Sequence, residues 1–199
     1  MSIAVLQPVR RSNTNSPHIS STAKSQKEQN SEDDTVVIYN RIPKTGSTSL
    51  KHVVAQLSII NNFNWIHFNT TRFLKVFGLA DQRRFITNIT NWEEKKPAFY
   101  DGHLAFIDFS RFGIRKLPIY INVVREPLAR LMSHYYFLRY GDNYDPNRVR
   151  KKAHDHRTFD DCVAMDGEDC GPAKMWVQVP FFCGHSEECW SVLFVSQTS

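Results

Sequence analysis

The chain has 199 residues, which is enough for one domain with a substantial core, and its 41% hydrophobic and 23% charged residues are ordinary for a globular protein. No apolar run in it approaches the length that a membrane-spanning helix needs. The formal net charge of +5 suits an acidic partner, but nucleic acid, an anionic membrane and a sulfated sugar would each supply one, so charge does not choose among them.

The first 34 residues differ in composition from the rest. They are dominated by Ser, Asn, Gln, Lys and acidic residues, without a sustained apolar period. The opening MSIAVL is too short for the core of a signal peptide, and the polar RRSNTNS follows it. The sequence therefore predicts a disordered or stem-like leader over residues 1–34.

Residues 36–57 predict a strand, a loop and a helix. VVIY suits a short buried strand, and the apolar residues from Leu50 to Leu57 recur at helical spacing. A loop that opens a helix presents free backbone N–H groups and the positive end of the helix dipole, which both favour a bound phosphate. The intervening NRIPKTGSTS adds a cation, a close-approach glycine and hydroxyl groups, from Lys44, Gly46, Thr45, Ser47, Thr48 and Ser49.

This loop does not match the nucleoside-triphosphatase pattern G-x-x-x-x-G-K-[ST], because its first Gly is absent and its Lys precedes the Gly. Two interpretations stay open from the residues alone. The loop is a phosphate site, or it is a helix N-terminus whose Ser and Thr residues serve as caps.

Two further predicted strands carry histidines. NNFNWIHFNTT predicts a strand with a loop that includes His67, and residues 98–100 predict a strand that Gly102 breaks. His103 then lies at the carboxyl end of a strand, where parallel sheets bind ligands. A neutral imidazole there can remove a proton from a hydroxyl group. A packed or hydrogen-bonded structural histidine is the alternative for both residues.

The clearest strand is IYINVV at residues 119–124, and Pro127 suits the first turn of the helix that follows. Arg125, at the carboxyl end of this strand, suits a bidentate contact with phosphate, and Ser133 lies a little over two helical turns further on. As isolated residues, an ion-paired arginine and a solvated serine are the more ordinary interpretation.

A basic run spans residues 148–157 and includes Arg150. It is either a solvated loop or a surface for a polyanionic glycan; nucleic acid fits less well, since no aromatic residues are interleaved as stacking platforms. Sequons at Asn69 and Asn88 and an even number of cysteines indicate an oxidising compartment. The cysteine spacing does not resemble paired zinc knuckles, so disulfides are favoured, with three possible connectivities among Cys162, Cys170, Cys183 and Cys189.

NRIPKTGSTS resembles the 5′-phosphosulfate loop of Golgi carbohydrate sulfotransferases, most closely that of the heparan sulfate 2-O-sulfotransferases. The resemblance continues through FYDGHLAFIDFSRFG, PIYINVVREPLARLMSHYYFLRYGD, TFDDCVA and WVQVPFFCGHSEECW, and so covers residues 36–190. It implies a sulfotransferase domain over residues 35–190 that is incomplete on its C-terminal side, because members of the family continue further, and a divergent tail over residues 191–199.

The resemblance implies an α/β fold of the P-loop-containing sulfotransferase type, with a central parallel sheet flanked by helices. It implies sulfuryl transfer from 3′-phosphoadenosine 5′-phosphosulfate to the 2-O position of uronic acid (iduronate) in heparan sulfate, without a metal. His103 would be the base and Lys44 would offset charge on the leaving group. The resemblance also implies that residues 45–49 bind the 5′-phosphate and that Arg125 and Ser133 bind the 3′-phosphate. The implied contacts with the glycan are Arg41, His67 and Arg150.

Heparan members of the family usually carry a histidine where Asp101 stands here, which leaves the pH optimum and turnover open. The family pairs its cysteines locally, as Cys162–Cys170 and Cys183–Cys189. It also implies the Golgi lumen, a single N-terminal membrane anchor that this sequence lacks, and a homo-oligomer. The alternatives are a dermatan or chondroitin uronyl 2-O-sulfotransferase, a P-loop kinase, and an inactive truncated form that binds glycan or nucleotide.

Overall fold

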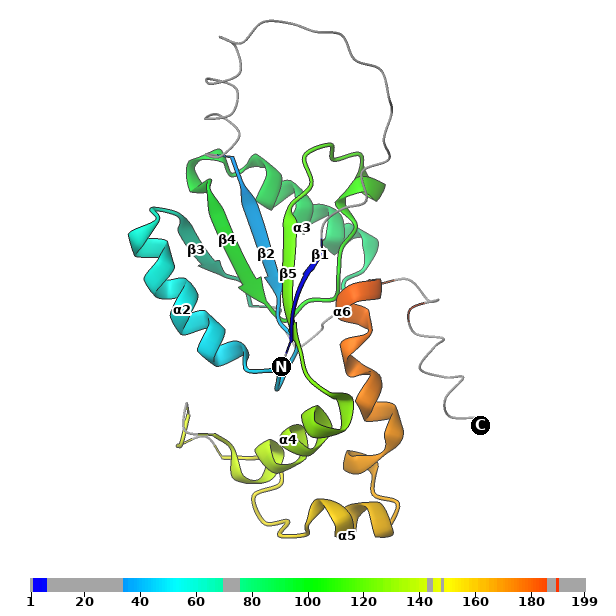
Figure 1. Cartoon of the computed structure of the whole chain (residues 1–199). Coiled ribbons are helices and arrows are strands. Elements are labelled where there is room, and N and C mark those ends of the chain that lie inside the picture. Colours follow the sequence, from blue (N-terminus) through cyan, green and yellow to red (C-terminus); the bar gives the residue numbers. More distant parts are fainter. Residues whose placement is uncertain are drawn as a thin grey trace, which may run out of the picture.

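The computed structural model describes residues 2–6, 34–69, 76–142, 145–147, 149–185 and 189. Its centre is a five-stranded sheet in the order β1-β5-β2-β4-β3 (Figure 1). Four of the strands are parallel and β1 runs antiparallel to β5. The strands are β1 (Ser2–Leu6), β2 (Val36–Asn40), β3 (Asn64–His67), β4 (Ala98–Gly102) and β5 (Ile119–Val124).

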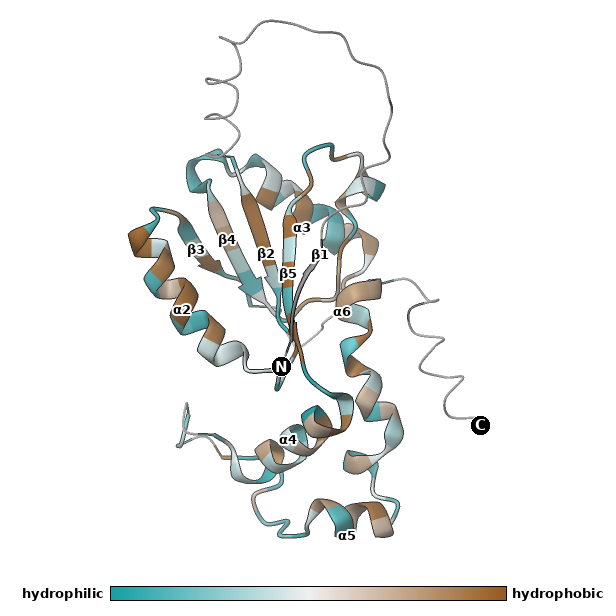
Figure 2. Cartoon of the chain, in the orientation of Figure 1, coloured by the Kyte–Doolittle hydropathy of each residue, from teal (hydrophilic) through white to brown (hydrophobic). Residues whose placement is uncertain are grey.

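Helices cover both faces of the parallel strands, as the sequence predicted for an α/β fold. Residues of one strand alternate between the faces: Tyr39 packs with Val54 of α2 (Ser47–Ile60), whereas Ile38 packs with Ile86 of α3 (Leu79–Asn91). Figure 2 shows the hydrophobic residues of β2 at the middle of this arrangement. A parallel strand that is covered on both faces reads as a nearly continuous apolar run, which is why the strand signal in VVIY was clear.

The predicted leader is wrong for residues 2–6. These residues form β1, which pairs with β5 from Ser2 opposite Val124 to Leu6 opposite Tyr120. The apolar run SIAVL suits a strand, and the edge of β5 offers it unpaired backbone groups. Pairing at this distance in sequence leaves no local signal. Residues 7–33 of the predicted leader and residues 191–199 of the predicted tail lie outside the described residues.

A second group of helices lies beyond the carboxyl ends of the parallel strands (Figure 1). Pro127 begins α4 (Pro127–Tyr140), as predicted, and the Glu126 side chain caps the helix by accepting the N–H groups of Leu128 and Ala129. Two short helices follow, α5 (Phe159–Ala164) and α6 (Pro180–Cys183). The 3₁₀ turns are η2 (Glu93–Lys95), η3 (Phe109–Phe112), η4 (Glu168–Cys170) and η5 (Pro172–Gln178).

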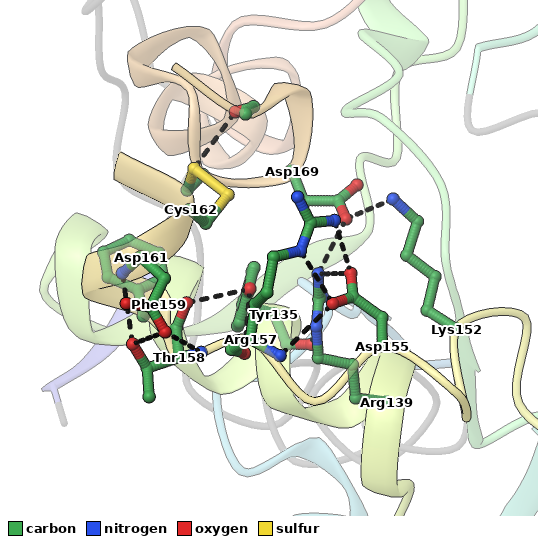
Figure 3. Close-up of polar contacts among 12 residues, drawn as sticks. Tyr135, Arg139, Lys152, Asp155, Arg157, Thr158, Phe159, Asp161, Cys162 and Asp169 are labelled. Carbon is green, nitrogen blue, oxygen red and sulfur yellow. Dashed lines mark hydrogen bonds and ion pairs between the residues drawn. A yellow bond between two sulfur atoms is a disulfide. The ribbon is translucent and has the colours of Figure 1, made fainter. Parts of the chain in front are cut away.

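Ion pairs and a disulfide fasten the second group of helices (Figure 3). The buried Arg139 contacts the carboxylates of Asp155 and Asp169, which also bind Arg157 and Lys152. The basic run is therefore partly engaged in ion pairs. The cysteines pair as the resemblance implied, Cys162 with Cys170 and Cys183 with Cys189. Among the described residues, none of the helices combines the length and the apolar character that crossing a bilayer requires.

Candidate functional site

The loop of residues 41–46 connects the carboxyl end of β2 to α2. Lys44 and Gly46 both have left-handed backbone angles, with φ of 68° and 83°. Gly46 is the N-cap of α2, so no side chain caps this helix, and its first turn contains no acidic residue. The structure therefore contradicts the capping interpretation. The first N–H groups of α2 remain available to an anion.

The hydroxyl groups of this loop differ in their surroundings. Thr45 is buried and donates its hydroxyl to the carbonyl of Ile42 at 3.0 Å, so its side chain holds the loop together. Ser47 is buried and Thr48 is half-buried, whereas Ser49 is exposed at the first turn of α2. An anion at this helix end would meet the backbone of residues 45–49 together with some of the hydroxyls.

Lys44 extends from the same loop toward α4. Its Nζ lies 4.1 Å from the centre of the Phe137 ring and 3.9 Å from Oδ2 of Asp142. Burial lowers the pKa of Lys44, Asp142 opposes that change, and repulsion from Arg125 and Arg150 adds to it. These three cations thus lie close enough to influence one another, which favours a shared anionic ligand.

Arg125 and Ser133 occupy the end of β5 and the middle of α4. The amide side chain of Gln178 fixes the Arg125 backbone: its Oε1 accepts the Arg125 N–H at 3.3 Å, and its Nε2 donates to the Arg125 carbonyl at 2.9 Å. Ser133 is half-buried. Gln178 could not be singled out from the sequence, because no periodic pattern connects Arg125 to a glutamine 53 positions away.

Asp101 and His103 follow one another at the end of β4. Asp101 is fully buried, and its carboxylate lies 2.8 Å from Arg41 Nη1, 2.8 Å from Trp65 Nε1 and 3.2 Å from His67 Nδ1. His103 lies beyond it, with Nδ1 2.8 Å from the carbonyl oxygen of Arg41 and Nε2 3.3 Å from Arg41 Nη2. The β4 strand thus presents a histidine at the edge where the loop of residues 41–46 begins.

The three predicted glycan-binding residues are placed differently. His67 is the most open, with its side chain 45% exposed. Arg150 packs over Phe137, 4.8 Å from the ring centre, and donates to the carbonyl of Asp145 at 2.7 Å. Both arginine side chains are almost enclosed, Arg41 at 11% and Arg150 at 10% exposed, but their ion-pair partners differ. Asp142, the partner of Arg150, is itself 39% exposed, whereas Asp101, the partner of Arg41, is fully buried. An arginine that compensates a fully buried carboxylate is better placed to organise a site than to bind a glycan.

Two cavities of the described chain lie away from these residues. One is at the amino ends of β2 and β5, near Asp34 and Lys116, and the other is between the start of α3 and His185. The predicted sequon residues Asn69 and Asn88 are both exposed, Asn88 on α3 and Asn69 just after β3.

Residues 27–199 match the model of a family described as "Sulfotransferase family". The chain is 55% identical over 161 residues to "Heparan sulfate 2-O-sulfotransferase 1" of Gallus gallus and of Homo sapiens, which covers 81% of this chain and 45% of each relative. It is also 55% identical over 159 residues to "Heparin sulfate O-sulfotransferase" of Drosophila melanogaster, over 80% of this chain and 46% of that protein. The chain thus spans less than half the length of these relatives.

Proposed function

This chain belongs to the sulfotransferase family, and from that premise we propose that it transfers a sulfuryl group from 3′-phosphoadenosine 5′-phosphosulfate to the 2-hydroxyl of a uronic acid (iduronate) in heparan sulfate. The names of its relatives support the acceptor. One structural observation carries the proposal. Arg41, whose side chain and carbonyl both contact His103, begins the loop that carries Lys44 three residues later.

The proposed donor site follows the loop of residues 41–46 into α2. Backbone N–H groups of residues 45–49 would bind the 5′-phosphate, where no side chain competes for the end of the helix. Arg125 would bind the 3′-phosphate as a planar, permanently charged fork, and Ser133 would donate a hydroxyl to it. The proximity of Arg125 to Lys44 supports a single bound anion that spans both.

The proposed transfer is a displacement at sulfur. The acceptor hydroxyl gives its proton to Nε2 of His103 while its oxygen forms a bond to sulfur. The bond between sulfur and the bridging oxygen breaks, and adenosine 3′,5′-bisphosphate leaves with the electron pair. Lys44 offsets the negative charge that develops on that oxygen, as cations do in phosphoryl transfer. No step requires a metal.

For the acceptor glycan we propose His67 and Arg150 as contacts, since His67 is exposed and Arg150 lies near the start of the basic run with a partly exposed ion-pair partner, Asp142. Arg41 was predicted to bind the glycan as well. Its ion pair with the fully buried Asp101 and its two contacts with His103 favour a positioning role in this chain. The same groups would serve a dermatan or chondroitin uronate, so the acceptor must be tested directly.

We also propose the Golgi lumen as the location and a homo-oligomer as the state of the full-length form. The paired cysteines are consistent with an oxidising compartment, and Asn69 and Asn88 are exposed where glycosylation would need them. The membrane anchor remains an expectation from the family.

The test is transfer of labelled sulfate from the donor to desulfated heparan by this chain, with desulfated dermatan as the second acceptor. Incorporation at the uronate 2-O position of heparan supports the proposal. Incorporation into dermatan alone would reassign the acceptor. One alternative is a form that binds without catalysis. Binding of adenosine 3′,5′-bisphosphate without any transfer would identify that form.

A further inference from the structure

The buried carboxylate of Asp101 is unusual in its setting. It lies in the penultimate position of β4, opposite Tyr39 of β2 and His67 of β3. A carboxylate is costly to bury unless it is hydrogen-bonded and paired with a cation. Arg41 supplies the charge, and Trp65 supplies a donor-only indole N–H, at 2.8 Å each. Both oxygens of Asp101 therefore act as acceptors.

Arg41 connects Asp101 to His103. Its Nη1 pairs with Asp101, and its Nη2 lies 3.3 Å from Nε2 of His103. A guanidinium only donates, so Nε2 must carry the lone pair in this contact. The Arg41 carbonyl only accepts, so Nδ1 of His103, at 2.8 Å, must carry the hydrogen. Both contacts select the same neutral tautomer, which is the one with Nε2 ready to accept a proton.

The same guanidinium presents an electrostatic difficulty. A positive charge 3.3 Å from Nε2 disfavours protonation of the imidazole and would weaken it as a base. Asp101 lies on the other side of the guanidinium and offsets that charge. Among the described residues, the charged or titratable groups around this pair include Arg41 after β2, Asp101 on β4, His67 on β3 and Tyr39 on β2. Tyr39 stays neutral, because burial raises the pKa of its hydroxyl to about 12.

We infer that Asp101 is the positioning residue for His103 and acts through Arg41. It holds the guanidinium that fixes the His103 tautomer, and it compensates the charge that would otherwise lower the proton affinity of Nε2. This role rests on the proposed function for its consequence in catalysis. The geometry itself, and its effect on the histidine, can be measured without any transfer.

The decisive experiment follows His103 by ¹⁵N NMR of the full chain, with the His103→Gln variant to assign its signal among 8 histidines. Asp101→Asn should lower the pKa of His103 by about half to one unit, because Arg41 is no longer compensated. Arg41→Gln should raise that pKa by a similar amount, because the cation itself is gone. If Asp101 and Arg41 had a purely structural role, the two substitutions would shift the pKa of His103 in the same direction, or neither would shift it.

The Asp101→Asn substitution also changes the hydrogen bonding at position 101. The amide has a single oxygen, so when it accepts from Arg41 its NH₂ group faces the N–H of Trp65. The double variant Trp65→Phe/Asp101→Asn removes that opposed pair of donors and keeps the test valid if the single variant does not fold. Trp65→Phe alone is the matched control. It removes one donor from the same carboxylate without a change in charge, and the pKa of His103 should stay within about 0.2 units.

The catalytic readout is the pH profile of kcat/KM for sulfate transfer. Asp101→Asn should move the acidic limb to lower pH and reduce the plateau about 10-fold, since a weaker base transfers protons less readily. If the two variants shift the pKa of His103 in opposite directions but the parent chain transfers no sulfate, the proposed function is refuted and the positioning role stands. An unchanged pKa and tautomer of His103 in folded Asp101→Asn would overturn the positioning role.

Discussion

The ammonium group of Lys44 lies 4.1 Å from the centre of the Phe137 ring, in the position of a cation over an aromatic face. The contact joins the loop of residues 41–46 to α4, the helix that carries Ser133. Burial lowers the pKa of Lys44, which means that the cation is partly removed from water. A desolvated cation interacts more strongly with the charge of a leaving group than an exposed one does.

The aromatic face itself is therefore expected to matter. Phe137→Leu keeps an apolar side chain but removes the ring under Lys44 and Arg150. Loss of a cation–π contact of about 0.5–2 kcal/mol predicts a decrease of about 2- to 30-fold in kcat/KM for the donor. Phe137→Tyr keeps the ring and should retain most of the activity. Equal activity of the Leu and Tyr variants would show that the ring contributes only packing.

Lys44 also bears a conformational cost. Its φ of 68° is in the left-handed region, where a side chain with a Cβ is disfavoured by about 1–2 kcal/mol per residue. The free energy of unfolding in urea should therefore be about 1 kcal/mol higher for Lys44→Gly than for Lys44→Ala. Both variants lack the charge, so the comparison isolates the Cβ, which only alanine has. Both variants should lose sulfate transfer by about 100-fold or more. A glycine variant no more stable than the alanine variant would argue against strain at Lys44.

The strands, the main helices and the loop could be predicted because their signals are local. The runs at residues 36–39 and 119–124 are apolar and β-branched, and both form strands. Pro127 and the strand end before His103 were likewise readable from neighbouring residues. Each of these features depends on a few positions in sequence and not on the register of the sheet.

The contacts of Asp101 could not be predicted in the same way. They depend on the pairing of β4 with β2 and β3, which brings Arg41 and Trp65 to one carboxylate from positions 60 and 36 residues away. The direct histidine partner of Asp101 is His67, and Asp101 reaches His103 only through Arg41. The β1 strand could not be predicted for the same reason, because its partner β5 is distant in sequence.

His185 predicts a pH dependence of stability. Its Nδ1 accepts the N–H of Phe77 at 2.9 Å, so the ring must be neutral there, and Nε2 donates to the carbonyl of Ala105 at 3.2 Å. Burial lowers the pKa of His185, although the bond to Ala105 works in the opposite direction. The neutral ring contributes its full stability above the ordinary pKa of about 6.5, and that contribution is lost as pH falls from there through the lowered folded-state pKa.

The measurement is the urea midpoint of the parent chain and of His185→Gln between pH 8 and pH 5. A glutamine can accept and donate at the same place but does not titrate, so the variant should lose less stability on acidification. His156→Gln is the matched control, because His156 is exposed and its replacement should leave the pH dependence unchanged. Parallel curves for the parent and His185→Gln would exclude His185 as the source.

The disulfide between Cys162 and Cys170 is expected to support the donor site from a distance. Both cysteines pack in one apolar cluster with Leu131 and Tyr135 of α4 and with Phe159 of α5. The bond closes a loop with a sequence separation of 8, for which the chain-entropy relation gives about 2–3 kcal/mol of stabilisation. Replacement of both cysteines by alanine should lower the free energy of unfolding by at least that amount, because buried sulfur contacts are lost as well.

The same variant tests whether α4 connects stability to function. Because Ser133 is on α4 and Arg125 immediately precedes the helix-capping Glu126, a loosened α4 should weaken donor binding more than acceptor binding. We expect the KM for the donor to rise several-fold while the KM for desulfated heparan changes less. Replacement of Cys183 and Cys189, which lie outside the α4–α5 cluster, is the matched comparison. Equal effects of the two double variants on the donor KM would mean that general destabilisation, and not α4, is responsible.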